Sequence, residues 1–141
     1  MSVGRISLKL RNRLSELNIL SQTLERFGET LALPQKTLFE LNLALEELVT
    51  NIISYGYRDD ADHWIQIAIS HENAILTIRL EDDGIPFDPV EAEPPDCNCP
   101  VEERTIGNLG IYLTKKVMDD MVYERHENKN ILTLRKNLHD V

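Results

Sequence analysis

The chain has 141 residues, a length that fits one domain, and we expect residues 1–141 to form a single domain. Its 15 basic and 24 acidic side chains give a formal net charge of −9 at pH 7, which argues against a nucleic-acid partner because the phosphate backbone would repel it. No apolar run is long enough to span a membrane and no basic-then-apolar N-terminal segment predicts export, so we expect a cytoplasmic protein with no membrane partner.

A strand and two helices are predicted first. Residues 5–10 alternate weakly between apolar and polar and predict a short edge strand. From about Asn12 to Leu31, large apolar side chains recur every three or four residues, a pattern typical of a helix packed on a core: Leu14, Leu17, Leu20, Leu24 and Phe27. Pro34 suits the first turn of a second helix, which we expect to run to about Tyr55 and to end at Gly56.

The second helix carries a carboxylate and a carboxamide, Glu47 and Asn51, four residues apart. At this spacing both side chains project from one face on successive turns. An amide oxygen together with phosphate oxygens suits Mg²⁺, which keeps several waters, and a carboxylate one turn away can take a proton from a hydroxyl group. A solvated helix face produces the same pair by chance, so the spacing alone leaves both interpretations open.

Two strands, at about 64–70 and 74–81, are predicted next and are joined by a tight hairpin. Asp82 and Gly84 follow the second strand. An acid at the end of a strand can accept a hydrogen bond from a ligand amine, and a glycine lets the backbone approach that ligand closely. Asp and Gly are also common turn residues, and an ordinary turn is the alternative interpretation.

Residues 84–106 hold five of the six prolines and six acids against one base, so they cannot build a packed core on their own. A loop of this length is usually functional or disordered, and we predict a lid over a binding site, with a disordered insertion as the alternative. The two cysteines of the chain, Cys97 and Cys99, lie in this segment. We expect free thiols there, because no second pair of cysteines is present to complete a zinc site.

Gly107 and Gly110 open a third predicted helix, at about 109–121. Glycines at a helix start expose backbone N–H groups, which suit a phosphate chain together with the helix dipole; a flexible loop is the alternative. Strands at about 121–125 and 131–136 then form a last hairpin. The elements predict an α/β two-layer sandwich, with a mixed, mostly antiparallel sheet and the helices on one face.

Taken in this order, the Glu47–Asn51 helix, the Asp82–Gly84 turn and the Gly107–Gly110 helix start resemble one family. They are similar to the GHKL ATP-binding domain, also called the histidine-kinase-like ATPase domain, which gyrase, heat-shock chaperones, histidine kinases and mismatch-repair ATPases share. Within this family, the chain is most similar to the anti-sigma regulatory factors, which are small serine kinases. The resemblance extends from about Arg5 to Lys136, and it implies ATP and Mg²⁺ as cofactors.

The resemblance also implies a role for each site residue. Glu47 corresponds to the catalytic base and Asn51 to the Mg²⁺ ligand, and residues 84–106 correspond to the ATP lid. The remaining nucleotide-binding residues that it implies are Asp82 for the adenine amine, Gly84 beside the ring, Gly107, Asn108, Leu109 and Gly110 for the phosphates, and Thr133 near the adenine.

The sequence departs from the family in three places. Pro86 replaces the second glycine of the adenine-binding turn, and Asn108 replaces a glycine that the anti-sigma branch often has. Proline fixes the backbone angle φ, whereas asparagine tolerates a left-handed backbone better than most residues. Residues 18–22 also lack the arginine with which anti-sigma kinases grip their partners, so ATP binding is better supported than any particular partner.

Three functions compete. The first is an anti-sigma-type serine/threonine kinase, a homodimer that binds a sigma factor and phosphorylates a small protein antagonist. The second is a non-catalytic, nucleotide-gated protein-binding switch. The third is a histidine-kinase catalytic domain, which needs a phosphoacceptor histidine on a dimerisation helix, and the predicted elements leave no spare helix pair. Glu47 favours the first function over the second, because a protein that only binds nucleotide needs no base.

Overall fold

The structure of the chain, a computed structural model, describes residues 4–91 and 108–138, and for residues 91, 108 and 109 it describes the backbone only. In chain order, the elements are β1 (Gly4–Arg11), the one-turn helix η1 (Leu14–Glu16), α1 (Leu17–Thr30), α2 (Gln35–Tyr55), β2 (Trp64–Glu72), β3 (Ile75–Asp82), the one-turn helix η2 (Pro89–Glu91), α3 (Asn108–Val117), β4 (Asp120–His126) and β5 (Lys129–Asn137).

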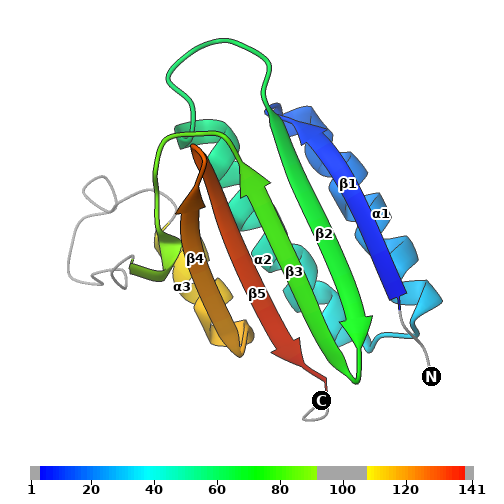
Figure 1. Cartoon of the computed structure of the whole chain (residues 1–141). Coiled ribbons are helices and arrows are strands. Elements are labelled where there is room, and N and C mark those ends of the chain that lie inside the picture. The colour runs from blue at the N-terminus through cyan, green and yellow to red at the C-terminus, as the bar shows by residue number, and fades with distance from the viewer. Residues whose placement is uncertain (1–3, 92–107, 139–141) are drawn as a thin grey trace.

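The five strands form one sheet in the order β1-β2-β3-β5-β4. All three α-helices lie on one face of this sheet, so the protein is a two-layer α/β sandwich, as predicted (Figure 1). Every neighbouring pair of strands is antiparallel. The sequence predicts a mixed, mostly antiparallel sheet; β3 and β4 do run in the same direction, but the β4–β5 hairpin places β5 between them.

Alternate residues of the strands point toward the helices and form the core. In β3 these are Leu76, Ile78 and Leu80, each at most 2% exposed. The helices contribute the apolar stripes that their spacing predicts, with Leu20, Leu24 and Phe27 from α1 and Leu41, Leu45 and Leu48 from α2. Asp82 continues the core-facing row of β3, so the row ends in a carboxylate.

Two element boundaries differ from the prediction. The first helix begins at Leu17 instead of near Asn12, because the Asn12 side chain accepts a hydrogen bond from the His63 backbone N–H at 2.9 Å and donates one to the Ala61 carbonyl at 3.2 Å. The third helix ends at Val117 instead of near residue 121, because the chain joins the sheet at once: the Asp119 backbone N–H donates to the Arg135 carbonyl at 2.9 Å.

The two hairpins are two-residue turns. Asn73 and Ala74 link β2 to β3, and Glu127 and Asn128 link β4 to β5; all four have positive φ, between 50° and 65°. Turns of this kind twist the backbone in the same sense as the flanking strands. They set the β2–β3 and β4–β5 registers, whereas Asp82 and Asn130 face each other in the β3–β5 pair, which neither turn connects.

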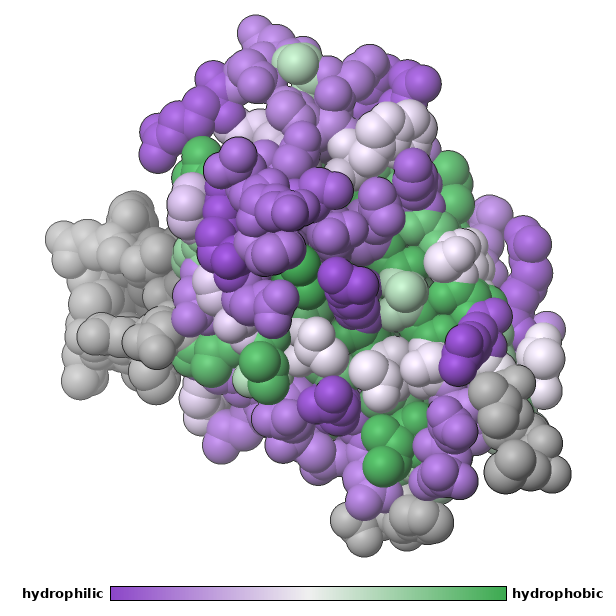
Figure 2. Space-filling view, in the orientation of Figure 1, coloured by the Kyte–Doolittle hydropathy of each residue, from purple (hydrophilic) through white to green (hydrophobic). Residues whose placement is uncertain are grey.

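The sheet face away from the helices is open and mainly hydrophilic (Figure 2). Arg5, Lys9 and Arg11 of β1 are exposed there, and at the opposite edge Asp120 and Glu124 of β4 are exposed. The β1 edge of the open face is therefore basic, whereas at the β4 edge Asp120 pairs with Arg135 of β5 at 3.4 Å. Separately, no helix among residues 4–91 and 108–138 is long and apolar enough to cross a membrane.

Candidate functional site

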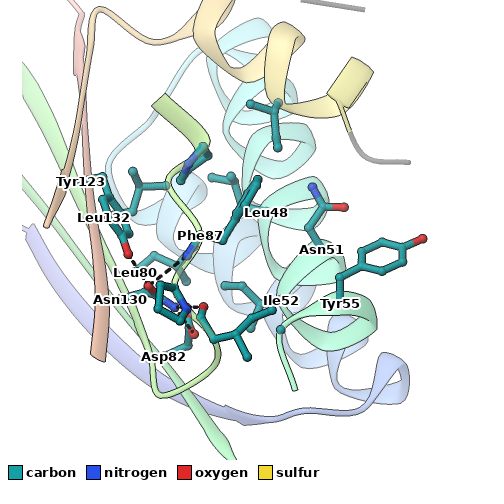
Figure 3. Close-up of a pocket in the computed structure, with 15 residues that line it drawn as sticks. Leu48, Asn51, Ile52, Tyr55, Leu80, Asp82, Phe87, Tyr123, Asn130 and Leu132 are labelled. Atoms are coloured by element: carbon teal, nitrogen blue, oxygen red, sulfur yellow. Dashed lines mark hydrogen bonds between the residues drawn. The ribbon is translucent and has the colours of Figure 1, made fainter. Parts of the chain in front are cut away.

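A cavity of about 520 Å³ lies between α2 and the ends of β3 and β5, a volume that suits a small-molecule ligand (Figure 3). Its wall is mainly apolar, with a few polar groups at its two ends. The lining residues are Leu48, Asn51, Ile52, Tyr55, Gly56, Leu80, Asp82, Ile85, Pro86, Phe87, Pro89, Ile111, Tyr123, Asn130 and Leu132.

Asp82 is the acid of this cavity, and the protein forms hydrogen bonds with one of its two carboxylate oxygens. The residue is 6% exposed and lies directly opposite Asn130 in the β3–β5 register. Its Oδ1 atom accepts hydrogen bonds from the Gly84 backbone N–H at 2.9 Å and from Asn130 Nδ2 at 3.0 Å. Burial raises the pKa of Asp82, and these two hydrogen bonds oppose that rise because they stabilise the carboxylate.

Asn130 is a site residue that the sequence analysis missed. Its Nδ2 donates to Asp82 and, at 2.8 Å, to the Ile85 carbonyl, and its Oδ1 accepts from the Tyr123 hydroxyl and, at 3.4 Å, from the Phe87 backbone N–H (Figure 3). Oδ1 also accepts from Arg125 at 3.1 Å. Arg125 also donates to the Gly84 carbonyl at 2.8 Å. One buried amide thus ties the two central strands to the turn that follows β3.

The turn after β3 requires glycine at position 84, because other protein atoms pack closely against its Cα atom. A side chain there would meet the Gly56 carbonyl oxygen at 2.5 Å and Asp82 Oδ1 at 2.9 Å. The next residue, Ile85, donates its backbone N–H to the same Gly56 carbonyl at 2.8 Å. The end of α2 and the turn after β3 are therefore in direct backbone contact, which closes the Asp82 end of the cavity.

Asn51 and Tyr55 project from α2 on the side of the cavity away from Asp82 and Asn130 (Figure 3). The Asn51 Nδ2 atom is buried and has no hydrogen-bond partner among the described residues. A buried polar atom without a partner is costly, so an amide in this position suits a ligand that completes its bonding. Rotation of the Asn51 amide by half a turn would direct its oxygen, in place of its nitrogen, toward the ligand.

Glu47 lies one turn before Asn51 on α2, outside the cavity lining, against the first turn of α3. A side chain on Gly110 would overlap the Glu47 carboxylate and approach its Cγ at 2.9 Å. The absence of a side chain at Gly110 therefore lets α3 approach this carboxylate. The positive end of the α3 dipole also favours a negative charge here.

A charged cluster lies beside Asp82. The His63 imidazole is held between Asp59, at 2.7 Å from Nε2, and Asp83, at 3.2 Å from Nδ1, and it stacks on the Tyr57 ring with 4.1 Å between centroids. The hydrogen bond that the imidazole donates to the Asp59 carboxylate, and then the one to Asp83, raises the pKa of His63. Burial, Asp82 and Asp83 raise the pKa of the Tyr57 hydroxyl, which therefore stays protonated.

The structure brings together some predicted site residues and not others. Asp82, Gly84 and Asn51 surround or border the cavity, and Glu47 and Gly110 touch each other beside it. Thr133 does not join them: Leu132 and Leu134 point to the core, so the side chain between them points to the open face. Of the predicted phosphate residues, Asn108 and Leu109 are placed by their backbone at the start of α3, and Gly107 lies outside the described residues. Cys97 and Cys99, the predicted free thiols, and residues 92–106 of the predicted lid also lie outside them.

The described residues suit an adenine nucleotide that carries its own metal ion. Asp82 offers an acceptor at the end of an apolar cavity, which is what an adenine amino group needs. Within residues 4–91 and 108–138, no group of three or more His, Cys, Asp and Glu side chains is arranged to hold a metal. Asn51 supplies one amide, so a Mg²⁺ ion there must take most of its ligands from phosphate and water.

Comparison with known proteins identifies the family. The chain belongs to the histidine kinase-like ATPase domain family, which matches residues 10–136. The family predicted from the sequence is thereby confirmed.

Three similar proteins are each named serine-protein kinase RsbW. The protein of Bacillus cereus (strain ATCC 10987 / NRS 248) is 26% identical over 132 residues, which cover 91% of this chain and 82% of that protein. Those of Bacillus thuringiensis (strain Al Hakam) and Bacillus anthracis (strain A0248) are 25% identical over the same length and shares.

The fold is also found in a solved structure, that of the RsbU and RsbW domains of Rv1364c from Mycobacterium tuberculosis. It matches with a TM-score of 0.70 and 12% sequence identity over 96% of this chain. The chain spans about a third of that protein, since the match covers 32% of it. The likeness confirms the predicted fold class.

Proposed function

We propose that this chain binds Mg-ATP and transfers the γ-phosphate to a serine or threonine hydroxyl of a small regulatory protein. The observation that carries the proposal is the order of groups along one path: Asp82 at one end of the cavity, Asn51 at the other, and Glu47 one turn beyond. The names of the RsbW relatives support the same activity.

Each residue has a distinct task in this proposal. Asp82 accepts a hydrogen bond from the adenine amine, and the apolar wall holds the ring. Asn51 gives an amide oxygen to the metal ion, and the backbone of the first turn of α3, near Gly110, donates N–H groups to phosphate. The bound metal ion, when present, neutralises charge that develops on the phosphate oxygens.

Glu47 receives the proton of the acceptor hydroxyl. Its carboxylate lies beyond Asn51, against the start of α3, where an acceptor side chain can approach the terminal phosphate from outside the cavity. Proton transfer to a positioned carboxylate contributes about 10²–10⁴-fold in rate, and positioning of the phosphate supplies much of the remainder.

The resemblance to anti-sigma regulatory factors gives the class of partner. We expect a sigma factor and a serine-bearing antagonist as binding partners, no nucleic acid, a homodimer, and a cytoplasmic location. A phosphoserine adds about −1.5 to −2 charge. Because this chain already carries −9, the phosphorylated antagonist is expected to leave more readily than the unphosphorylated one.

The test is labelled ATP with candidate antagonist proteins of the native host, using Glu47→Ala, Asn51→Ala and the control Glu46→Ala. Glu46 is an exposed neighbour on α2, so its variant should keep full activity. Glu47→Ala should bind ATP normally and lose at least about 100-fold in transfer rate, whereas Asn51→Ala should lose Mg²⁺-dependent binding.

Three outcomes count against the kinase. Transfer at the wild-type rate by Glu47→Ala rules out the base. Label on histidine moves the chain to the histidine-kinase class. Intact ATP-dependent partner binding with no label on any partner favours the non-catalytic switch.

A further inference from the structure

We infer that Asn130 is a positioning residue that orients the Asp82 carboxylate for base recognition and does not itself contact the base. The inference rests on the proposed function only in taking the cavity to hold the base of a nucleotide. It starts from the hydrogen-bonding capacity of one buried side chain, which is 7% exposed.

The amide of Asn130 is fully used by the protein. A carboxamide has two N–H donors and one oxygen with two lone pairs. The two donors meet Asp82 Oδ1 and the Ile85 carbonyl, and the oxygen accepts from the Tyr123 hydroxyl, from Arg125 and, at 3.4 Å, from the Phe87 backbone N–H. No donor or lone pair is left for a ligand, although Asn130 lines the cavity.

The partners also fix which way the amide faces. Both atoms near Nδ2 are acceptors and the atoms near Oδ1 are donors. A flipped amide would place oxygen against a carboxylate and NH₂ against a guanidinium, so only one orientation satisfies all of these contacts.

This arrangement gives the two carboxylate oxygens of Asp82 different roles. Oδ1 accepts from Asn130 and from the Gly84 backbone, which uses both of its lone pairs. Among the described residues, Oδ2 accepts no hydrogen bond, and it is the oxygen left for a ligand amine. Asn130 thus sets which oxygen, and in which direction, the protein presents.

The same amide links this carboxylate to the turn that follows it. Asn130 holds the Ile85 carbonyl, and Arg125 holds both Asn130 Oδ1 and the Gly84 carbonyl. The turn that carries Gly84 is therefore fixed by the residue that orients Asp82, so the acid and the close-packed glycine cannot shift independently.

The experiment measures ADP affinity by calorimetry from pH 4.5 to 8 for the wild type, Asn130→Ala, Asn130→Asp, Tyr123→Phe and Thr133→Ala. Loss of a donor to the carboxylate raises the pKa of Asp82, so the pH below which ADP affinity falls should move upward in Asn130→Ala. It should move further in Asn130→Asp, where two carboxylates face each other.

At pH 7.5, Asn130→Ala should bind ADP about tenfold more weakly. Tyr123→Phe removes a donor to Asn130 and leaves Asp82 bonded, so it should change affinity by less than about threefold. Thr133→Ala, on the same strand but the other face, is the matched control and should behave as the wild type. Circular dichroism and a ligand-free melting curve check that each variant is folded.

Two results would overturn the inference. One is wild-type affinity and pH dependence in both Asn130 variants. The other is weaker binding with an unchanged pH dependence, which would mean that Asn130 contacts the base directly. Failure of the proposed function looks different, since the wild type would then bind no ADP or bind it equally well with Asp82→Ala. If Asn130→Ala does not fold, Asn130→Asp, which has the same shape, decides the matter.

Discussion

Asp82 and Asn130 show how a polar site is formed at the end of an apolar core. Asp82 is the last core-facing residue of β3 and Asn130 is the first of β5, next to Leu80 and Leu132, and the antiparallel register places them directly opposite each other. Because the preceding pairs are apolar, both polar side chains are desolvated and must satisfy each other. The remaining free acceptor faces a cavity in place of bulk water.

Because the two carboxylate oxygens of Asp82 have different roles, they predict how Asp82 variants bind ADP. Asp82→Ala removes the acceptor for the adenine amine and should cost about 1–3 kcal/mol of ADP affinity. Asp82→Asn should be equally impaired, because its single oxygen is needed at the Oδ1 position by Asn130 and Gly84 and its NH₂ then faces the ligand amine.

Calorimetry with ADP and with inosine diphosphate checks this. The inosine base presents an acceptor where adenine has its amine, so Asp82→Asn should gain relative affinity for it. Glu72→Ala, exposed on β2 away from the cavity, is the control. Unchanged ADP affinity in Asp82→Ala would refute the adenine role.

His63 is predicted to make stability depend on pH. Asp59 and Asp83 raise the pKa of His63 in the folded state. The stabilisation of the folded state by the protonated imidazole is therefore fully present below the unfolded pKa of about 6.5, and it is lost as pH rises through the folded pKa. The free energy of unfolding from urea titrations should therefore fall as pH rises above about 6.5.

His63→Gln should flatten this pH dependence. His126→Gln is the control, because His126 is exposed on β4 and its one ion pair among the described residues is with Glu127 at 3.7 Å. An equal pH slope in the wild type and in His63→Gln would show that the imidazole between the two acids contributes nothing.

Individual site residues were harder to predict from the sequence than the strands and turns that carry them. Asp82 and Gly84 could be found because an acid and a glycine directly follow an apolar strand. Asn130 was missed because Ile131 and Leu132 are both apolar, so the sequence does not show which residues of this strand face the core. The structure settles it: Leu132 and Leu134 share a face with Asn130, and Thr133 lies on the other.

At the scale of elements, α2 and α3 meet where Glu47 contacts Gly110. Gly110→Ala should destabilise the wild-type protein, because the added methyl group overlaps the Glu47 carboxylate. In a Glu47→Ala background the same change should stabilise by about 1 kcal/mol, because alanine favours a helix more than glycine does.

A double-mutant cycle from denaturant unfolding measures both effects. Gly28→Ala is the control, since Gly28 is also in a helix but packs on Leu38, and its effect should not depend on Glu47. If Gly110→Ala has the same effect in both backgrounds, the contact between Glu47 and Gly110 contributes nothing to the free energy of unfolding.

Element types were predictable and their ends were less so. The apolar stripes of α1 and α2 and the alternation of β2 identify these elements without ambiguity. The start of α1 depends on side-chain bonds between Asn12 and the loop before β2, and the end of α3 depends on pairing with β5. Both are contacts between distant residues, which local sequence patterns do not contain.

For the whole molecule, nucleotide binding should appear as added stability. A ligand at about 100 times its dissociation constant stabilises the folded state by about 2.7 kcal/mol. Mg-ATP should therefore raise the melting temperature, and removal of Mg²⁺ with EDTA should reverse part of the rise.

Asn51→Ala should lose the EDTA-sensitive part and keep the rest, because Asp82 still binds the base. Asn42→Ala, on the same helix and outside the cavity, is the control. A melting temperature that responds to EDTA equally in the wild type and in Asn51→Ala would exclude the metal-ligand role.

The position of β5 in the sheet has a consequence for synthesis of the protein. β5 is made after the other four strands, yet it lies between β3 and β4 and not at an edge. While the ribosome is still adding residues 129–137, β3 and β4 have no common neighbour and Asp82 has no Asn130 to hold it. The nascent chain can thus form its α1–α2 and β1–β2–β3 portion early, but it completes the cavity around Asp82 only when the β4–β5 hairpin docks, through β5, on the free edge of β3.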